Sequence, residues 1–141
     1  MKRIILSFLF VGIASFTGVT NCKSFYKKKC RPQVAPYTHN GQMNNAVLRP
    51  GDKAEIMLTF NSGKEYRLII CAMENLGKVK FKVMDIDRNV IYTNEKERDK
   101  KTFDFKVAST QQLIVEMEVP DKTPLNEIQP EGCVNVLVGF K

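Results

Sequence analysis

The chain contains 141 residues, of which 43% are hydrophobic and 26% are charged, and this globular composition excludes wholesale disorder. All 15 acidic side chains lie beyond Pro32 together with an equal number of basic ones, so the formal net charge of +7 comes entirely from the N-terminal part. With a near-neutral body and no recognisable nucleic-acid-binding motif, we expect no nucleic-acid partner.

The start of the chain has the pattern of a signal peptide. Lys2 and Arg3 precede an apolar run from Ile4 to Val11, and small or weakly polar residues follow. This order is typical of a secretory leader, and the apolar run is too short to cross a bilayer as a helix. We therefore predict a signal peptide over residues 1–21 and an exported protein, either periplasmic or secreted.

A basic segment follows the leader. Five cations and no acid lie in the ten residues after Asn21, and residues 32–45 are rich in Pro, Asn and Gly without apolar periodicity. We predict that residues 22–45 form a basic N-terminal tail and loop. The tail is either a solvated spacer or a segment that contacts anionic lipid or a polyanionic glycan. Its cations are Lys23, Lys27, Lys28, Lys29 and Arg31.

Alternation of apolar and polar residues begins near Ala46. Between Lys78 and Val83, lysines alternate with apolar residues, which places all three lysines on one face of a strand. The compact turn at 61–64 predicts that the two strands beside it pair as a hairpin. Strands are predicted at 54–60, 66–73, 78–83, 90–93, 103–107, 113–119 and 133–140, with a charged loop at 94–101 and a Pro-rich loop at 120–132.

This pattern predicts the fold class. Seven or eight short strands joined by turns, without a convincing amphipathic helix, are typical of an all-β protein. The strands that contain Cys71 and Cys133 are apolar on both faces, which favours two packed sheets. We predict that residues 46–141 form an antiparallel, jelly-roll-like β-sandwich.

Four cysteines remain after the leader, and they allow three disulfide connectivities. Cys71 ends a predicted strand and Cys133 begins one, so we favour a Cys71–Cys133 disulfide, which leaves Cys22–Cys30 as a local bridge. Alternatively, the residues before Cys22 resemble a lipobox, although Asn21 differs from the usual Gly, Ala or Ser. Lipidation of Cys22 would anchor the protein to a membrane and leave Cys30 unpaired.

Few residues have the pattern of an active site, and we expect neither a metal nor a cofactor. His39 is the single histidine and no GxSxG element accompanies it. The Asp85–Asn89 segment resembles the start of a calcium loop, but Val90 and Lys96 replace the glycine and glutamate that an EF-hand needs. No CxxC pair indicates zinc.

Several short motifs resemble those of exported β-sandwich domains of the bacterial pre-peptidase C-terminal type. They are LRPGD at 48–52, GKEYR at 63–67, VMD at 83–85 and VIY at 90–92. The resemblance implies a jelly-roll-like sandwich of about eight strands that acts as an accessory or binding module without catalytic residues.

Together these observations predict a non-catalytic exported cell-envelope protein that binds another protein or a surface polymer. One alternative is a carbohydrate-binding module, which would need a row of exposed tyrosines. A second alternative is an enzyme, which would need His39 beside acidic groups in a concave pocket.

Overall fold

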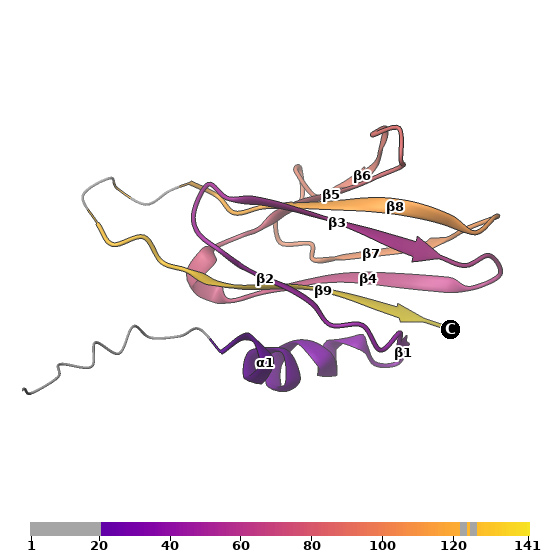
Figure 1. The fold of residues 1–141 in the computed structure, drawn as a ribbon, viewed down its shortest axis with the longest axis horizontal. Helices are drawn as coiled ribbons and strands as arrows, with labels where there is room; N and C mark the ends of the chain where they lie inside the picture. Colours follow the sequence, from indigo (N-terminus) through magenta and orange to yellow (C-terminus); the bar gives the residue numbers. More distant parts are fainter. Residues whose placement is uncertain (1–20, 122–123, 125–126) are drawn as a thin grey trace, which may run out of the picture.

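The computed structural model describes residues 21–121, 124 and 127–141, so nearly all of the predicted signal peptide lies outside the described residues. In the described part, two antiparallel sheets stack face to face, and a helical segment lies along one of them (Figure 1). The predicted antiparallel β-sandwich is confirmed, and this part of the chain has nine strands rather than seven or eight.

Sheet A has five strands and sheet B has four. In sheet A the order is β1, β9, β4, β7, and β2 also pairs with β9, on the side that β4 leaves free. In sheet B the order is β3, β8, β5, β6. The bounds are β1 (Thr38–His39), β2 (Asn44–Leu48), β3 (Lys53–Phe60), β4 (Glu65–Ala72), β5 (Lys80–Met84), β6 (Val90–Thr93), β7 (Thr102–Lys106), β8 (Gln111–Glu118) and β9 (Gly132–Phe140).

A line of aromatic rings joins the two sheets through the core. Phe60 on β3 lies 4.9 Å, between ring centroids, from both Tyr66 and Phe105. The line continues from Phe105 to Phe103 at 5.0 Å and from Phe103 to Tyr92 at 4.4 Å. Aromatic pairs at these separations add about 0.5–1.5 kcal/mol each beyond the area they bury. These rings therefore fill the space between the two sheets.

The turn at Asn61–Lys64 joins the two sheets rather than two paired strands. β3 pairs with β8, whereas β4 pairs with β7 and β9, so the expected hairpin is wrong. Gly63 has a φ of +82°, which glycine adopts without steric cost, and the Asn61 N–H donates to Tyr66 Oη at 2.8 Å. The same tight turn can serve a hairpin or an arch, because the long-range partners of the flanking strands decide which one forms.

The predicted tail and loop over 22–45 is wrong for residues 22–34, which are helical. This segment contains α1 (Cys22–Phe25), a π-helical turn η1 (Tyr26–Cys30) and a 3-10 turn η2 (Arg31–Val34), and β1 and β2 follow. Tyr26, Cys30 and Val34 are buried at intervals of four residues, so one side of the helical segment packs on sheet A. The described residues contain no helix that is both long and apolar enough to cross a membrane.

Gly139 on β9 permits the helical segment to approach the sheet. A Cβ atom at this position would lie 2.7 Å from the Tyr37 Cβ and 2.9 Å from the Val34 Cγ1. Ile69, Cys71 and Leu137 form the rest of this second, smaller core on the outer face of sheet A. The apolar outer face of β9, which suggested a second sheet, is therefore covered by the N-terminal segment.

Candidate protein-interaction surface

A row of apolar side chains crosses the outer face of sheet B, on the side away from the core. The strand register aligns Met57 on β3 with Ile114 on β8, Ile114 with Met84 on β5, and Met84 with Val90 on β6. On β3, β8 and β5 the neighbouring residues Leu58, Leu113 and Val83 point into the core. The row therefore occupies positions that strand alternation assigns to solvent.

The next two rows on one side of it are charged, and their charges are paired with one another. Lys80 lies 3.4 Å from Glu118, which also pairs with Lys53 at 3.9 Å. In the next row, Lys82 lies 3.3 Å from Glu116. The outer face of sheet B therefore combines an apolar row with paired charges along one side of it.

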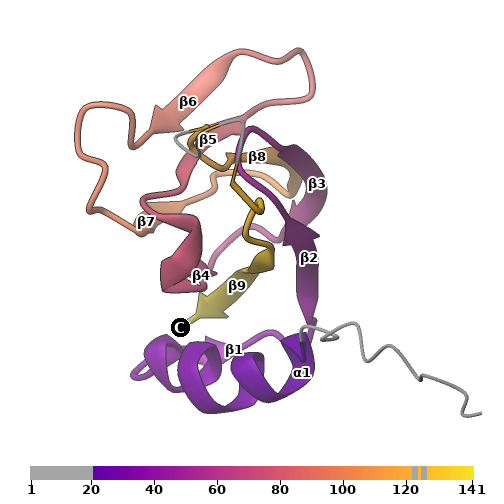
Figure 2. The same ribbon diagram turned by 90° about the vertical axis from the view of Figure 1, so that its left-hand side faces the viewer.

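The β5–β6 hairpin folds over this face. Figure 2 shows the hairpin at the top, reaching across β5 and β8 towards β3. Arg88 in its turn donates to both carboxylate oxygens of Glu55 on β3, at 2.9 and 3.1 Å. Ile86 in the same turn lines a hollow with Thr59 of β3. Glu55 and Thr59 lie on either side of Met57 along β3, so the hairpin turn approaches this strand on both sides of Met57.

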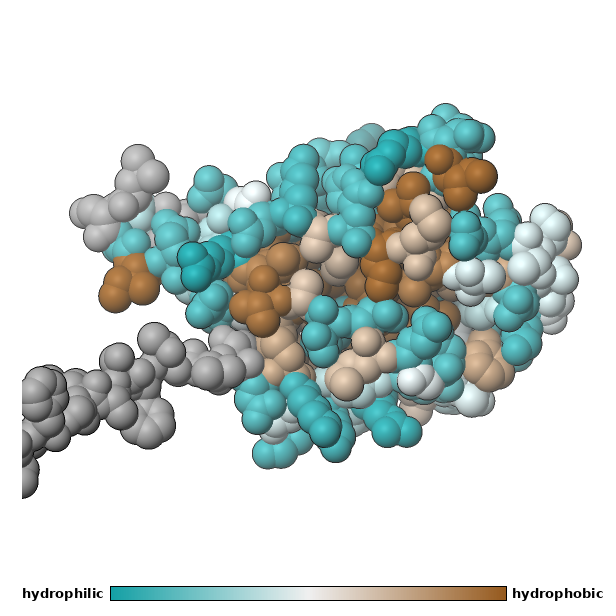
Figure 3. All heavy atoms as spheres, in the orientation of Figure 1, coloured by the Kyte–Doolittle hydropathy of each residue, from teal (hydrophilic) through white to brown (hydrophobic). Residues whose placement is uncertain are grey.

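The hairpin covers the middle of the row and leaves its ends open. Met84 and Ile114 are only 3% and 5% exposed, whereas Met57 is 54% exposed. Three large apolar side chains of the hairpin are also more than half exposed. Figure 3 shows hydrophobic atoms at the surface at the upper right, where the hairpin lies. We name this surface the sheet B patch; it consists of Met57, Ile86, Val90 and Ile91.

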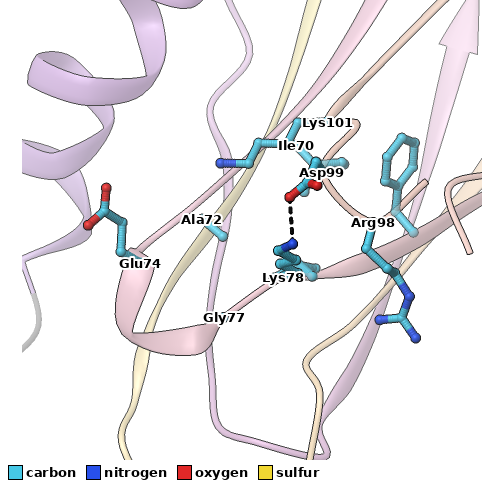
Figure 4. A pocket seen from close by; sticks show the side chains of 10 residues that line it. Ile70, Ala72, Glu74, Gly77, Lys78, Arg98, Asp99 and Lys101 are labelled. Carbon is cyan, nitrogen blue, oxygen red and sulfur yellow. Dashed lines mark ion pairs between the residues drawn. The ribbon is translucent and has the colours of Figure 1, made fainter.

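A hollow of about 260 Å³ opens where β4 and β5 approach each other (Figure 4). Ile70 and Phe81 belong to its apolar lining, and Lys78 and Asp99 form an ion pair of 2.8 Å beside it. Pockets for whole small molecules usually measure about 300–1,000 Å³. This hollow lies just below that range.

His39 links the N-terminal segment to the sheet edge. Its Nε2 lies 3.0 Å from the Tyr26 hydroxyl, and its Nδ1 accepts from the Gly41 N–H at 3.1 Å. A Nδ1 that accepts leaves the proton of neutral imidazole on Nε2, which donates to Tyr26. Burial, and to a lesser degree the charge of Arg31, lower the pKa of His39. Both ring nitrogens are thus engaged in contacts that position the chain, and neither hydrogen bond involves an acid.

The tyrosines form no exposed row of the kind that a sugar platform uses. Tyr26 and Tyr66 are buried, and Tyr92 stacks within the core. Tyr37 is half-buried between the guanidinium of Arg67 and the ammonium of Lys141, at 4.5 and 4.6 Å from its ring centre.

The carboxylate of Asp85 is used within its own turn. It accepts from the backbone N–H of Asn89 at 2.9 Å and from the Asn89 side-chain amide at 3.1 Å, and both bonds lower the pKa of Asp85. Arg88 sits between them in the sequence with a φ of +66°. Among residues 21–121, 124 and 127–141, no group of three or more His, Cys, Asp or Glu side chains could hold a metal ion.

The disulfide pairing differs from the favoured prediction. Cys22 pairs with Cys133 and Cys30 pairs with Cys71, with Cα atoms 5.5 and 5.6 Å apart. Because the helical segment crosses the outer face of β4 and β9, each of its two cysteines reaches a strand cysteine. The predicted Cys71–Cys133 and Cys22–Cys30 pairs are wrong. A Cys22 sulfur in this disulfide has no valence for a lipid, so the disulfide and the predicted lipidation are mutually exclusive.

Sequence reasoning overlooked both the sheet B patch and one buried polar residue. Met84 lies on the same strand face as Lys80 and Lys82, and Ile114 lies on the same strand face as Glu116. An apolar residue on the charged face of two strands was the signal in the sequence that could have revealed the patch. Asn94 lies in the predicted charged loop, but it is 1% exposed and accepts a hydrogen bond from the Phe81 N–H on β5.

Comparison with solved structures identifies a similar fold. The crystal structure of Aeromonas hydrophila PliG, a periplasmic lysozyme inhibitor of g-type lysozyme, matches with a TM-score of 0.51 and 9% sequence identity. The match covers 75% of this chain and 89% of that chain. No family model and no curated protein matches the sequence. At this identity the likeness establishes the fold alone, and the resemblance to pre-peptidase C-terminal domains stays a prediction.

Proposed function

We propose that this chain is an exported, non-catalytic protein that binds another protein through the sheet B patch. The apolar row on the outer face of sheet B carries the proposal, because Met57 and Val90 at its two ends are more than half exposed. Exposed apolar groups with a polar rim are typical of protein contact surfaces. The paired charges beside the row would supply the rim.

Two further observations support this proposal. The two disulfides fit an oxidising compartment, as expected for an exported protein. The Aeromonas protein with the similar fold is described as a periplasmic inhibitor of g-type lysozyme. A lysozyme, and a g-type lysozyme first, is therefore the partner class that we propose to test.

The first test is a titration of the purified protein with g-type and other lysozymes, in which binding is measured by calorimetry. The second test measures whether the protein inhibits the lysis of a cell-wall suspension by the same lysozymes. Met57→Lys places a charge at the exposed end of the row, and we expect it to weaken binding by about tenfold or more. Val47→Lys is the matched control, because Val47 is 48% exposed but lies on β2 in the other sheet.

Each outcome bears on a separate part of the proposal. If both variants bind a lysozyme as tightly as the unmodified protein does, the sheet B patch is not the contact surface. If no lysozyme binds, the partner class is wrong. Inhibition of lysis that is lost with Met57→Lys and kept with Val47→Lys would support both parts.

A further inference from the structure

The five cations of the N-terminal segment form a fixed cationic face, which consists of Lys23, Lys27, Lys28, Lys29 and Arg31. All five side chains are exposed. Tyr26 and Cys30 of the same segment point into the second core, so the cations spread around the solvent side of the helical segment.

Covalent bonds fix this face to the sandwich. Cys22 and Cys30 stand at the two ends of the nine-residue stretch that holds four of the five cations, and each is bonded to a strand of sheet A. The hydrogen bond that His39 Nε2 donates to the Tyr26 hydroxyl adds a third connection between the helical segment and the sandwich. The cations are thus arranged in advance, and little chain entropy is lost when they meet a partner.

The charge of this face is not neutralised by neighbouring acids. No acidic residue occurs between Cys22 and Gly51, and none of the ion pairs among the described residues involves one of the five cations. By contrast, Lys80 and Lys82 on sheet B each have a carboxylate within 3.4 Å. Clustered cations without partners gain most from an extended negative potential.

We propose that the cationic face binds the surface of an anionic phospholipid membrane. The face is a convex helical ridge in Figure 2, which suits contact with a broad surface. Four of its five cations are lysines, whose compact charges respond to a diffuse surface potential rather than to one bidentate ligand. The apolar side of the segment is occupied by the sheet, so binding is electrostatic, without insertion.

This binding would orient the molecule. The helical segment covers the outer face of sheet A, whereas the sheet B patch lies on the opposite side of the sandwich (Figure 2). A molecule held by the cationic face therefore presents the sheet B patch away from the membrane. The membrane proposal does not depend on the proposed protein partner.

The test is co-sedimentation of the purified exported protein with vesicles of phosphatidylcholine alone and of phosphatidylcholine with about 30% phosphatidylglycerol. We expect binding to the second vesicle only, with an affinity that falls as salt is raised. A surface cation contributes about fivefold to such binding, so Lys27→Gln with Lys28→Gln should weaken it about 25-fold.

Lys96→Gln with Lys101→Gln is the matched control, because both side chains are exposed and the same charge is removed from another part of the surface. We expect this control to bind like the unmodified protein. Equal weakening by both pairs would reduce the effect to net charge and overturn the proposal. Binding to dextran sulfate with no vesicle binding would also overturn it, in favour of a polyanionic polymer.

Discussion

Arg88 and Glu55 join the two ends of sheet B across its outer face. Arg88 lies in the turn between β5 and β6, Glu55 lies on β3, and β8 runs between β3 and β5. Two hydrogen bonds of 2.9 and 3.1 Å link the guanidinium to the carboxylate. This contact fixes the hairpin over Met84 and Ile114, so it determines how much of the apolar row reaches solvent.

The same contact predicts the titration of Glu55. Its hydrogen bond to Arg88 lowers the pKa of Glu55 below the ordinary value of 4.5. The contact therefore stabilises the fold above that ordinary value, and the stabilisation is lost as the pH falls through the lowered pKa. We expect Arg88→Gln to bring the Glu55 pKa back towards its ordinary range, measured by NMR titration of the side-chain carboxyl. Arg49→Gln, which removes an ion pair with Glu131 instead, should leave the Glu55 pKa unchanged.

Removal of the Arg88 contact should also loosen the hairpin. In Arg88→Gln, we expect faster amide hydrogen exchange over residues 85–90 and stronger binding of a hydrophobic dye, because Met84 and Ile114 lose part of their cover. Exchange in β9 should not change. If the amide protons of the hairpin exchange as slowly as in the unmodified protein, the turn keeps its position without Arg88.

Both disulfides join the N-terminal segment to a distant strand, which makes them easy to distinguish from the pairing expected from sequence. Digestion without reduction, followed by mass spectrometry, should yield peptides that link Cys22 to Cys133 and Cys30 to Cys71. A peptide that links Cys71 to Cys133 would contradict the structure. A lipid-modified Cys22 in the native protein would contradict the first pair.

The sequence separations predict the stability that each disulfide contributes. Cys22 and Cys133 are 111 residues apart and Cys30 and Cys71 are 41 apart. Chain entropy alone gives about 5 and about 4 kcal/mol for loops of these lengths. Replacement of Cys30 and Cys71 by alanine should therefore lower the free energy of unfolding by about 2–5 kcal/mol, measured with urea.

The sandwich was predictable from local pattern because strand alternation reports directly which side of a residue is buried. Leu58 and Phe60, and likewise Val79 and Phe81, face the core as their spacing indicates. Sheet membership was not predictable in this way. The turn at 61–64 has the same local chemistry in a hairpin and in an arch between sheets, and only the long-range pairing distinguishes them.

The helical segment was missed for a different physical reason. Its buried residues are Tyr26, Cys30 and Val34, and three lysines stand between the first two, so its mean hydropathy resembles that of a tail. The glycine that admits it, Gly139, lies more than 100 residues later. The cysteine pairing depends on this packing, which explains why spacing along the chain predicted the wrong partners.

Asn94 stabilises the loop between β6 and β7 from inside the protein. Its Oδ1 accepts from the Phe81 N–H at 2.8 Å, and its Nδ2 donates to the carbonyls of Val79 and Lys100 at 3.1 and 3.0 Å. We expect Asn94→Ala to cost about 2–4 kcal/mol of unfolding free energy, because buried backbone groups lose their partners. Asn45→Ala, at an exposed site on β2, should change it by less than about 0.5 kcal/mol.

His39 is the single histidine of the chain, and it should make stability depend on pH. Burial and the charge of Arg31 lower the folded-state pKa of His39 below 6.5, so folding favours the neutral ring. Stability is therefore complete above pH 6.5 and decreases as the pH falls towards the lowered pKa, since the unfolded chain takes up the proton more readily. His39→Gln should reduce the difference between urea midpoints at pH 7.5 and pH 5.5. Thr38→Ala, on the same short strand, should preserve that difference. If His39→Gln shows the same difference as the unmodified protein, the pH dependence of stability comes from other groups.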